Sequence, residues 1–142
     1  MRFAFIGSRD FKNKDIIRRQ IKRMIELYGD DLHVVSGRCP TGADEIADKI
    51  STELEVDFTG YPAKWSKYGK PAGPRRNTKV VKDVTSVFAF YTDRSNSRGT
   101  TDTVTKARIK GMPVFEWDEK TQSWWESCNN LPARQWWPGE TQ

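Results

Sequence analysis

The feature that most constrains the fold is a repeated alternation of apolar segments with segments of helical periodicity. Apolar runs predict strands at residues 2–6, 32–36, 56–61, 86–91 and 113–117. Between these runs, apolar side chains recur at helical spacing over residues 13–28, 44–54, 77–84 and 101–110. Such alternation is typical of a parallel sheet with helices on both faces. We therefore expect an α/β fold with about five strands.

A tryptophan-rich tail follows the last predicted strand. Five of the six tryptophans lie in it, at positions 117, 124, 125, 136 and 137. A length of 142 residues suits one domain, so we expect that domain over residues 1–116 and an extension over 117–142. Two aromatic pairs flank a turn in the extension, which favours a hairpin that packs on the domain. A stacking platform or a protein interface is the alternative.

Positive charge is concentrated in one segment. The chain has a formal net charge of +5. Residues 61–82 contain seven Lys or Arg and no Asp or Glu. Such a segment points to partners that carry phosphate, either nucleotides or nucleic acid, although a solvated basic surface would look the same.

The cysteines and the apolar runs argue against a metal site, an export signal and a membrane span. Cys39 and Cys128 are far apart and match no metal-ligand spacing, so we expect no metal site and a reducing, cytoplasmic location. The N-terminal apolar run is too short for an export signal. No apolar run reaches the roughly 18 residues of a membrane span. His33 is the only histidine and opens a strand, so we interpret it as structural.

The loops after the strands are expected to meet at one edge of the sheet. Right-handed crossovers place them there, and ligands of open α/β sheets bind outside the carboxyl ends of the strands. The relevant loops comprise residues 7–11, 36–44, 61–77 and 92–100. The first, second and fourth place glycine before a predicted helix, where backbone N–H groups attract anions.

The second loop adds two polar side chains. Thr41 is placed to cap the following helix. Asp44 lies in the first turn of that helix, where it accepts a hydrogen bond from a ribose hydroxyl or a backbone amide, or only stabilises the helix start.

The third loop combines prolines and glycines with a pair of arginines. The sequence between Pro71 and Pro74 predicts a rigid turn that presents Arg75, Arg76 and Asn77 at a helix start. A planar guanidinium group matches the oxygen atoms of a phosphate. We therefore expect this loop to contact a ligand phosphate.

Four motifs occur in order between residue 3 and about residue 115, namely IGSRDF, VVSGRCPTGAD, YPAKWSKYGKPAGPRRN and SRGT. Together they resemble the YspA-like branch of the SLOG superfamily, which includes YpsA-type proteins, DprA and the LOG hydrolases. The resemblance implies a Rossmann-like domain that holds a nucleotide or a nucleotide derivative, such as an ADP-ribose-like signal, above the strand ends. The tryptophan-rich tail lies outside the resemblance.

Carried over by position, the resemblance implies a ligand-binding set drawn from all four loops. Its members are Gly7, Ser8, Arg9, Ser36, Gly37, Thr41, Gly42, Asp44, Arg76, Asn77, Ser97, Gly99 and Thr100. The expected partner is a nucleotide-derived small molecule. No catalytic residue is assigned, and no cofactor is required.

Two other functions stay open. The LOG hydrolases, which cleave nucleotides at the N-glycosidic bond, have a catalytic Glu where this chain has Thr103, and Asp102 would point about 100° away on a helix. Arg38 also stands where relatives often have Gly, which adds bulk and charge near the expected phosphate. DprA binds single-stranded DNA, and a basic segment with interleaved aromatic residues suits that function. The sequence is compatible with a homo-oligomer.

Overall fold

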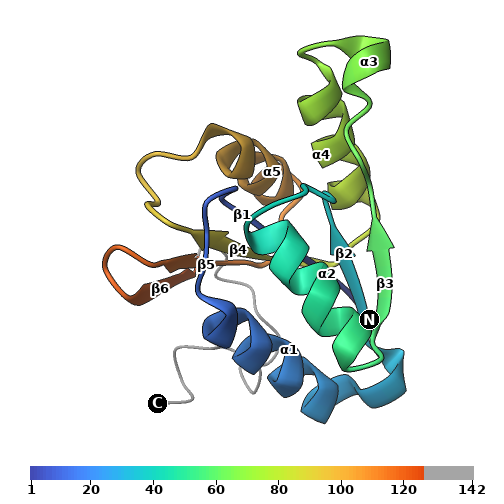
Figure 1. Cartoon of the computed structure of the whole chain (residues 1–142), viewed down its shortest axis with the longest axis vertical. Coiled ribbons are helices and arrows are strands. Elements are labelled where there is room, and N and C mark those ends of the chain that lie inside the picture. Colours follow the sequence, from blue (N-terminus) through green and yellow to red (C-terminus); the bar gives the residue numbers. More distant parts are fainter. Residues whose placement is uncertain (127–142) are drawn as a thin grey trace.

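The computed structural model describes residues 1–126, which form helical layers around one central sheet (Figure 1). The sheet has six strands in the order β3-β2-β1-β4-β5-β6. These are β1 Arg2–Gly7, β2 His33–Ser36, β3 Asp57–Gly60, β4 Ser86–Tyr91, β5 Val114–Asp118 and β6 Ser123–Glu126. The first five run parallel, and β6 pairs antiparallel with β5. The predicted Rossmann-like α/β fold is confirmed.

Helices cover both faces of the sheet (Figure 1). α1 (Lys14–Tyr28) and α2 (Ala43–Glu53) pack on one face, and α4 (Ala72–Lys82) and α5 (Arg98–Ile109) on the other. A 3₁₀ turn, η1 (Gly29–Asp31), follows α1, and a short helix, α3 (Trp65–Tyr68), stands at the start of α4. Within residues 1–126, no helix has both the length and the apolar character needed to cross a membrane.

Alternating side chains of the central strands build a core on each face. Phe3 and Phe5 of β1 lie in the cluster with α1 and α2, whereas Ala4 and Ile6 lie in the cluster with α4 and α5. Phe5 stacks on Phe88 with ring centres 5.0 Å apart. Burying one large apolar side chain contributes about 1.5–3 kcal/mol. The core therefore fixes the carboxyl ends of neighbouring strands relative to one another.

The segment at residues 71–77 differs from the predicted turn. α4 already begins at Ala72, so Arg76 and Asn77 lie inside a helix. Pro74 is tolerated because it lies in the first turn, where a backbone N–H has no intrahelical acceptor. The prediction of a loop was wrong because it treated proline as a helix breaker at a position where it is compatible with a helix start. Arg76 is nevertheless presented rigidly, by the helix.

β6 comes from the first part of the tryptophan-rich tail. The ring of Trp124 packs edge-on against Phe90 at 5.8 Å and contacts Phe88 and Trp117. The strand thus extends the aromatic core at the edge of the sheet. Residues 127–142, with the second aromatic pair Trp136 and Trp137, lie outside the described residues. The division between residues 1–116 and 117–142 stays a prediction.

Candidate functional site

A cavity of about 200 Å³ lies at the carboxyl ends of the strands. The strand order reverses between β1 and β4, and ligands of open α/β sheets occupy the crevice at such a switch point. We call it the switch-point cavity. Its lining residues are Ile6, Gly7, Ser8, Arg9, Gly37, Cys39, Asp44, Arg76, Asn77, Ser97, Gly99, Thr100 and Thr103.

Most of the predicted ligand-binding residues meet in this cavity. Those that line it are Gly7, Ser8, Arg9, Gly37, Asp44, Arg76, Asn77, Ser97, Gly99 and Thr100. Ser36, Thr41 and Gly42 are absent from the lining. The fold therefore brings the four sequence motifs together, and their contact with a ligand stays a prediction.

The three residues outside the lining have other places in the second loop. Ser36 is buried, and its hydroxyl accepts a hydrogen bond from the backbone N–H of Arg38 at 3.1 Å. Thr41 is exposed and does not cap α2, whose N-cap residue is Gly42. Gly42 has a φ of 78°, and a Cβ there would lie 2.2 Å from the carbonyl oxygen of Ser8. Glycine is required because the first and second loops touch at this point.

Three further residues line the cavity. Ile6 and Cys39 are absent from the predicted set. Ile6 directly precedes the glycine of the first motif, so the sequence already indicated that it lies at the end of a strand. The direction of the Cys39 side chain depends on the conformation of the turn, which the sequence does not indicate. Thr103 lines the cavity at the position where the resemblance implies a glutamate.

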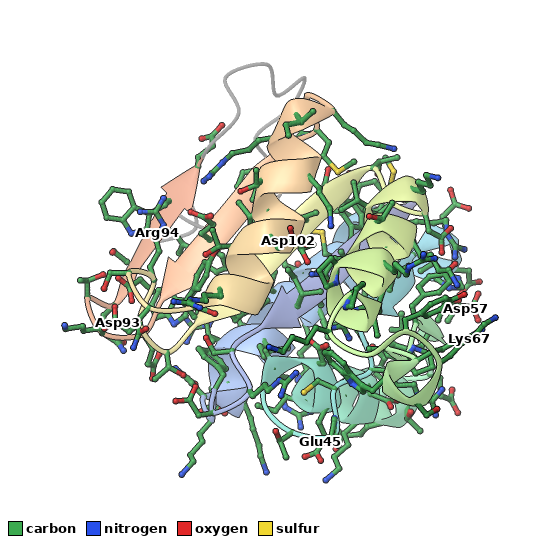
Figure 2. The ribbon with its side chains drawn as sticks, turned by 90° about the horizontal axis from the view of Figure 1, so that it is seen from above. Glu45, Asp57, Lys67, Asp93, Arg94 and Asp102 are labelled. Atoms are coloured by element: carbon green, nitrogen blue, oxygen red, sulfur yellow. The ribbon has the colours of Figure 1, made fainter. Side chains whose placement is uncertain are left out.

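Asp102, the neighbour of Thr103, takes a different direction. It lies between α5 and α4 (Figure 2), where its Oδ2 accepts hydrogen bonds from Asn77 Nδ2 at 3.0 Å and Lys106 Nζ at 2.7 Å. The expectation from helical geometry is confirmed. Asp102 positions Asn77 and does not itself line the cavity.

Arg76 is oriented by two acceptors. Its Nη1 donates to the carbonyl oxygen of Gly37, and its Nε donates to Asn77 Oδ1 at 2.8 Å. A Cβ at position 37 would lie 2.7 Å from Nη1, so the approach depends on glycine. A guanidinium has five N–H donors, and the remaining three have no acceptor within residues 1–126. They are free to bind an anion.

Asp44 is a buried carboxylate in the cavity wall, with 6% of its surface exposed. Its Oδ2 accepts a hydrogen bond from the backbone N–H of Cys39 at 3.3 Å. Its Oδ1 is buried and has no hydrogen-bond partner among the described residues. Burial raises the pKa of Asp44 to about 6, against the opposing effects of the Cys39 N–H, the charge of Arg76 and the nearby backbone N–H groups of Gly7 and Gly37, none of which forms a hydrogen bond of good geometry with Oδ1. A buried acceptor without a partner costs stability, which favours a ligand that supplies a donor.

The start of α5 forms another part of the cavity wall. Ser97 is its N-cap residue and makes no side-chain capping bond, and its first turn contains no acidic residue. The N–H groups of Gly99 and Thr100 have no acceptor within residues 1–126. Unpaired N–H groups and the helix dipole together attract negative charge. The fourth loop therefore leads into a helix whose first N–H groups have no acceptor within residues 1–126, and their contact with an anion stays a prediction.

The first loop does not lead directly into a helix, contrary to the prediction. α1 begins only at Lys14, and the side chain of Asn13 caps it. The loop reaches the cavity through Ser8 and Arg9 instead. The Ser8 hydroxyl accepts a hydrogen bond from the backbone N–H of Thr92 at 3.2 Å. This contact joins the loops that follow β1 and β4.

Arg38 is absent from the cavity lining. Its φ of 53° lies in the left-handed region that favours glycine. Its side chain packs over Gly60 at the end of β3, where an added Cβ would lie 2.8 Å from Arg38 Cδ. The expected crowding of a phosphate by Arg38 is therefore not observed.

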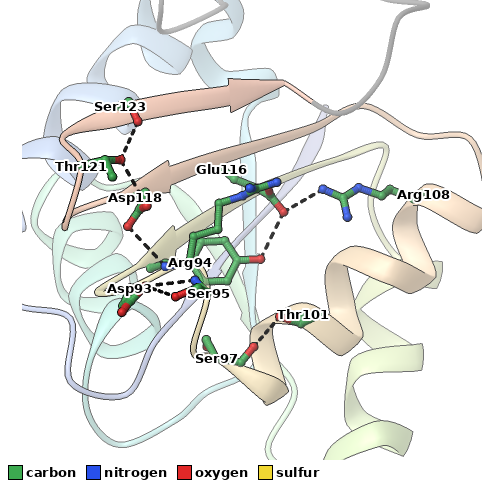
Figure 3. Close-up of polar contacts among 11 residues, drawn as sticks. Asp93, Arg94, Ser95, Ser97, Thr101, Arg108, Glu116, Asp118, Thr121 and Ser123 are labelled. Carbon is green, nitrogen blue, oxygen red and sulfur yellow. Dashed lines mark hydrogen bonds and ion pairs between the residues drawn. The ribbon is translucent and has the colours of Figure 1, made fainter.

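A second cavity, of about 370 Å³, lies between α5 and β5. At its centre the carboxylate of Glu116, 2% exposed, accepts hydrogen bonds from Arg94 Nε at 2.6 Å, Arg108 Nη2 at 3.0 Å and Tyr91 OH at 3.2 Å (Figure 3). We call these four residues the Glu116 network. It ties the loop after β4 to the sheet and to α5.

Comparison with known proteins gives a family match over part of the chain and a similar fold. Residues 1–68 match the YspA, cpYpsA-related SLOG family, so the predicted resemblance is confirmed over that part of the chain. No curated protein gives a significant sequence match. The fold is similar to the solved structure of the molybdenum cofactor binding protein from the phototrophic bacterium Rippkaea orientalis. The TM-score is 0.63 at 21% identity, over 82% of this chain and 76% of that chain. At this identity the similarity concerns the fold alone.

Proposed function

We propose that this chain, whose residues 1–68 match the SLOG family, binds a phosphorylated nucleotide or nucleotide derivative in the switch-point cavity. The ligand is of the ADP-ribose type, and the protein acts as a sensor or a sequestering module. The observation that carries the proposal is the pairing, in one small cavity, of anion-binding groups with a buried acceptor that lacks a partner.

The anion-binding groups suit a phosphate. Arg76 offers three free N–H donors on one side, and the uncapped start of α5 offers the N–H groups of Gly99 and Thr100 on another. Arg9 adds a second positive charge to the lining. Charge-assisted hydrogen bonds from a guanidinium are stronger than neutral ones. Within residues 1–126 Arg76 forms no salt bridge, and the nearby Asp44 carboxyl interacts with it only through its charge.

The buried acceptor suits a ribose hydroxyl. Asp44 would repel a phosphate, but its Oδ1 can accept a hydrogen bond from a hydroxyl group. A nucleotide carries both groups, whereas a free phosphate carries only one. The structurally similar protein from Rippkaea orientalis is described as binding a cofactor, which supports a small-molecule ligand for this fold.

The first test is to identify what the protein carries. Small molecules released from the purified, heat-denatured protein are analysed by mass spectrometry, and any nucleotide found is titrated back by calorimetry. If nothing is released, adenosine 5′-monophosphate and ADP-ribose are titrated as probes. Absence of binding to every nucleotide tested, by folded protein, would contradict the proposal.

We expect Arg76→Ala to weaken nucleotide binding on the order of 10- to 100-fold, because a charge-assisted hydrogen bond contributes about 1.5–3 kcal/mol. Isothermal titration calorimetry measures the change. The matched control is Arg19→Ala, which removes an exposed guanidinium from α1, outside the cavity lining. Equal affinity of the Arg76 variant and the wild type would remove Arg76 from the site.

Hydrolysis of the N-glycosidic bond is not part of the proposal. Thr103 occupies the position of the glutamate of the LOG hydrolases, and Asp102 faces Asn77 and Lys106. Among residues 1–126, Asp44 is the one carboxylate in the cavity lining. The site therefore has the groups to bind a nucleotide but no pair of acid and base that would cleave it.

Single-stranded nucleic acid is the second candidate ligand, favoured by the surface of α3 and α4. Lys67 lies at the rim of the molecule on α3 (Figure 2), and the neighbouring Trp65 is 50% exposed. Exposed aromatic rings beside cations are suited to stacking of bases along a phosphate backbone.

The salt dependence of binding distinguishes the two candidates. We expect nucleotide affinity to depend weakly on salt, because one or two phosphates are held in a cavity. An oligonucleotide that contacts four phosphates would instead show a log–log slope of about −3, from roughly −0.7 per phosphate. Fluorescence titrations at several salt concentrations measure the slope. Tight oligonucleotide binding with the steep slope, and no nucleotide binding, would favour the second candidate.

A further inference from the structure

We propose that the protein has a second anion subsite in a hollow between α3 and α4, so that its ligand carries two separated phosphate groups. This inference rests on the proposed function, namely that the switch-point cavity binds a phosphorylated nucleotide derivative. Within that class it favours nucleotides with separated phosphates over the ADP-ribose type, whose two phosphates are adjacent. The hollow, which we call the basic hollow, has a volume of about 40 Å³. Lys64, Tyr68, Arg75, Arg76 and Lys79 are among its lining residues.

The basic hollow concentrates positive charge without a counter-ion. Four of its lining side chains are cations and none is acidic. Within residues 1–126, none of the four forms a salt bridge. Like charges that share a small space repel one another, and a bound anion removes that repulsion. The volume exceeds what a single water needs and suits a compact group such as a phosphate.

A contact with α3 orients one of these cations, Arg75. The Arg75 guanidinium lies over the ring of Tyr68, 4.1 Å from its centre, in a cation–π contact that orients it. The pKa of the Tyr68 phenol is lowered, first by its hydrogen bond to Lys67 and the charge of Lys67, and then by the charges of Arg75 and Lys64. The same positive potential that favours the phenolate favours any other anion at this position.

Arg76 connects the two sites. It lines both the switch-point cavity and the basic hollow, so an anion in either would lie near the same residue. One molecule can therefore place a first phosphate among Arg76 and the start of α5 and a second among Lys64, Arg75 and Lys79. A nucleoside bisphosphate or a dinucleotide has this arrangement of charge, and a nucleoside monophosphate has not.

The test compares two probes, adenosine 5′-monophosphate and adenosine 3′,5′-bisphosphate, on the wild type and on a double variant with Lys64→Gln and Lys79→Gln. Both lysines are exposed, so the variant is expected to fold. We expect the bisphosphate to bind the wild type about 10-fold more tightly than the monophosphate. The double variant is expected to lose that advantage and to keep the monophosphate affinity. The matched control replaces two exposed lysines outside both linings, Lys22→Gln and Lys110→Gln.

Each other outcome has a definite meaning. If the monophosphate binds and the bisphosphate binds the wild type no more tightly, the second subsite is wrong while the proposed function stands. The same holds if the bisphosphate still binds the double variant more tightly than the monophosphate does. If neither of these nucleotides binds but ADP-ribose does, the second subsite is wrong while the proposed function stands; if none of the three binds, both fall together. If a single-stranded oligothymidylate binds more tightly than both nucleotides and the double variant weakens that binding alone, the basic hollow serves a nucleic-acid backbone and the inference is overturned.

Discussion

Glu116→Ala is expected to lower the free energy of unfolding by about 1.5–3 kcal/mol, because it removes a buried acceptor of three hydrogen bonds, while the Arg94 and Arg108 side chains, 35% and 38% exposed, keep part of their solvation. The carboxylate is 2% exposed and accepts hydrogen bonds from Arg94, Arg108 and Tyr91. Without it, two guanidinium groups face each other across a cavity (Figure 3). Denaturant unfolding followed by circular dichroism measures the loss.

A matched control separates this effect from the general loss of a carboxylate. Glu45 forms an exposed pair with Lys49 one turn along α2, with Oε1 and Nζ 3.4 Å apart, and Glu45→Ala is expected to cost only about 0.5 kcal/mol. Replacing the whole ionic group by apolar residues, as in Arg94→Met, Arg108→Met and Glu116→Leu together, is expected to recover most of the lost stability. A loss below about 1 kcal/mol for Glu116→Ala would contradict the account of the network.

The strands and most helices could be predicted because burial imposes a periodicity that the sequence records. β1 and β4 are buried along nearly their whole length, so they appear as uninterrupted apolar runs. The start of α4 could not be predicted in the same way. Proline and glycine at residues 71–74 favour a turn locally, but their positions in the first helical turn make them compatible with a helix. A hairpin was expected in the tail, but the pairing of β6 with β5 was hidden, because the four residues of β6 are half-buried or exposed and form no buried apolar run.

The candidate site was predictable where backbone geometry restricts the residue type. Gly42 is required by its positive φ and its close approach to the backbone of Ser8, and Gly37 leaves room for the Arg76 and Asp44 side chains as they are placed. Such glycines are visible in the sequence. The Glu116 network was not predictable, although a lone glutamate in an apolar strand indicates a buried partner. Arg94 and Arg108 come from a loop and a helix, and only the tertiary structure brings them to the same carboxylate.

Asp44 is expected to make the stability of the protein fall as the pH rises from about 4 to about 7. Burial raises the pKa of its carboxyl from 3.8 to about 6. Between these values the folded protein keeps a proton that the unfolded chain has already released, so the folded state binds more protons and loses stability with rising pH. At about 1.36 kcal/mol per unit, the loss reaches roughly 3 kcal/mol at neutral pH. Asp44→Asn removes the ionisable group and should abolish this contribution.

The measurement is the free energy of unfolding of the wild type and of Asp44→Asn at several pH values in this range. As the pH rises, the free energy of unfolding of the variant is expected to increase relative to that of the wild type. The difference should level off above the pKa of about 6. Asp48→Asn, four residues further along the same helix and outside the cavity lining, is the control and should follow the wild type. A difference that does not change with pH would show that water or a cation reaches the carboxylate.

A bound nucleotide should also change the ionisation of Asp44. A ribose hydroxyl that donates to Oδ1 stabilises the ionised form, so nucleotide affinity should rise with pH through the range in which Asp44 loses its proton. The second ionisation of the phosphate group itself lies at about pH 6, so the informative quantity is the difference in affinity between the wild type and Asp44→Asn. That difference should rise with pH for the nucleotide and not for inorganic phosphate, because phosphate offers the carboxylate no ribose hydroxyl. The stability that the empty protein loses by burying a charge would then be recovered when the ligand binds. A difference in nucleotide affinity that is independent of pH would separate Asp44 from the ligand.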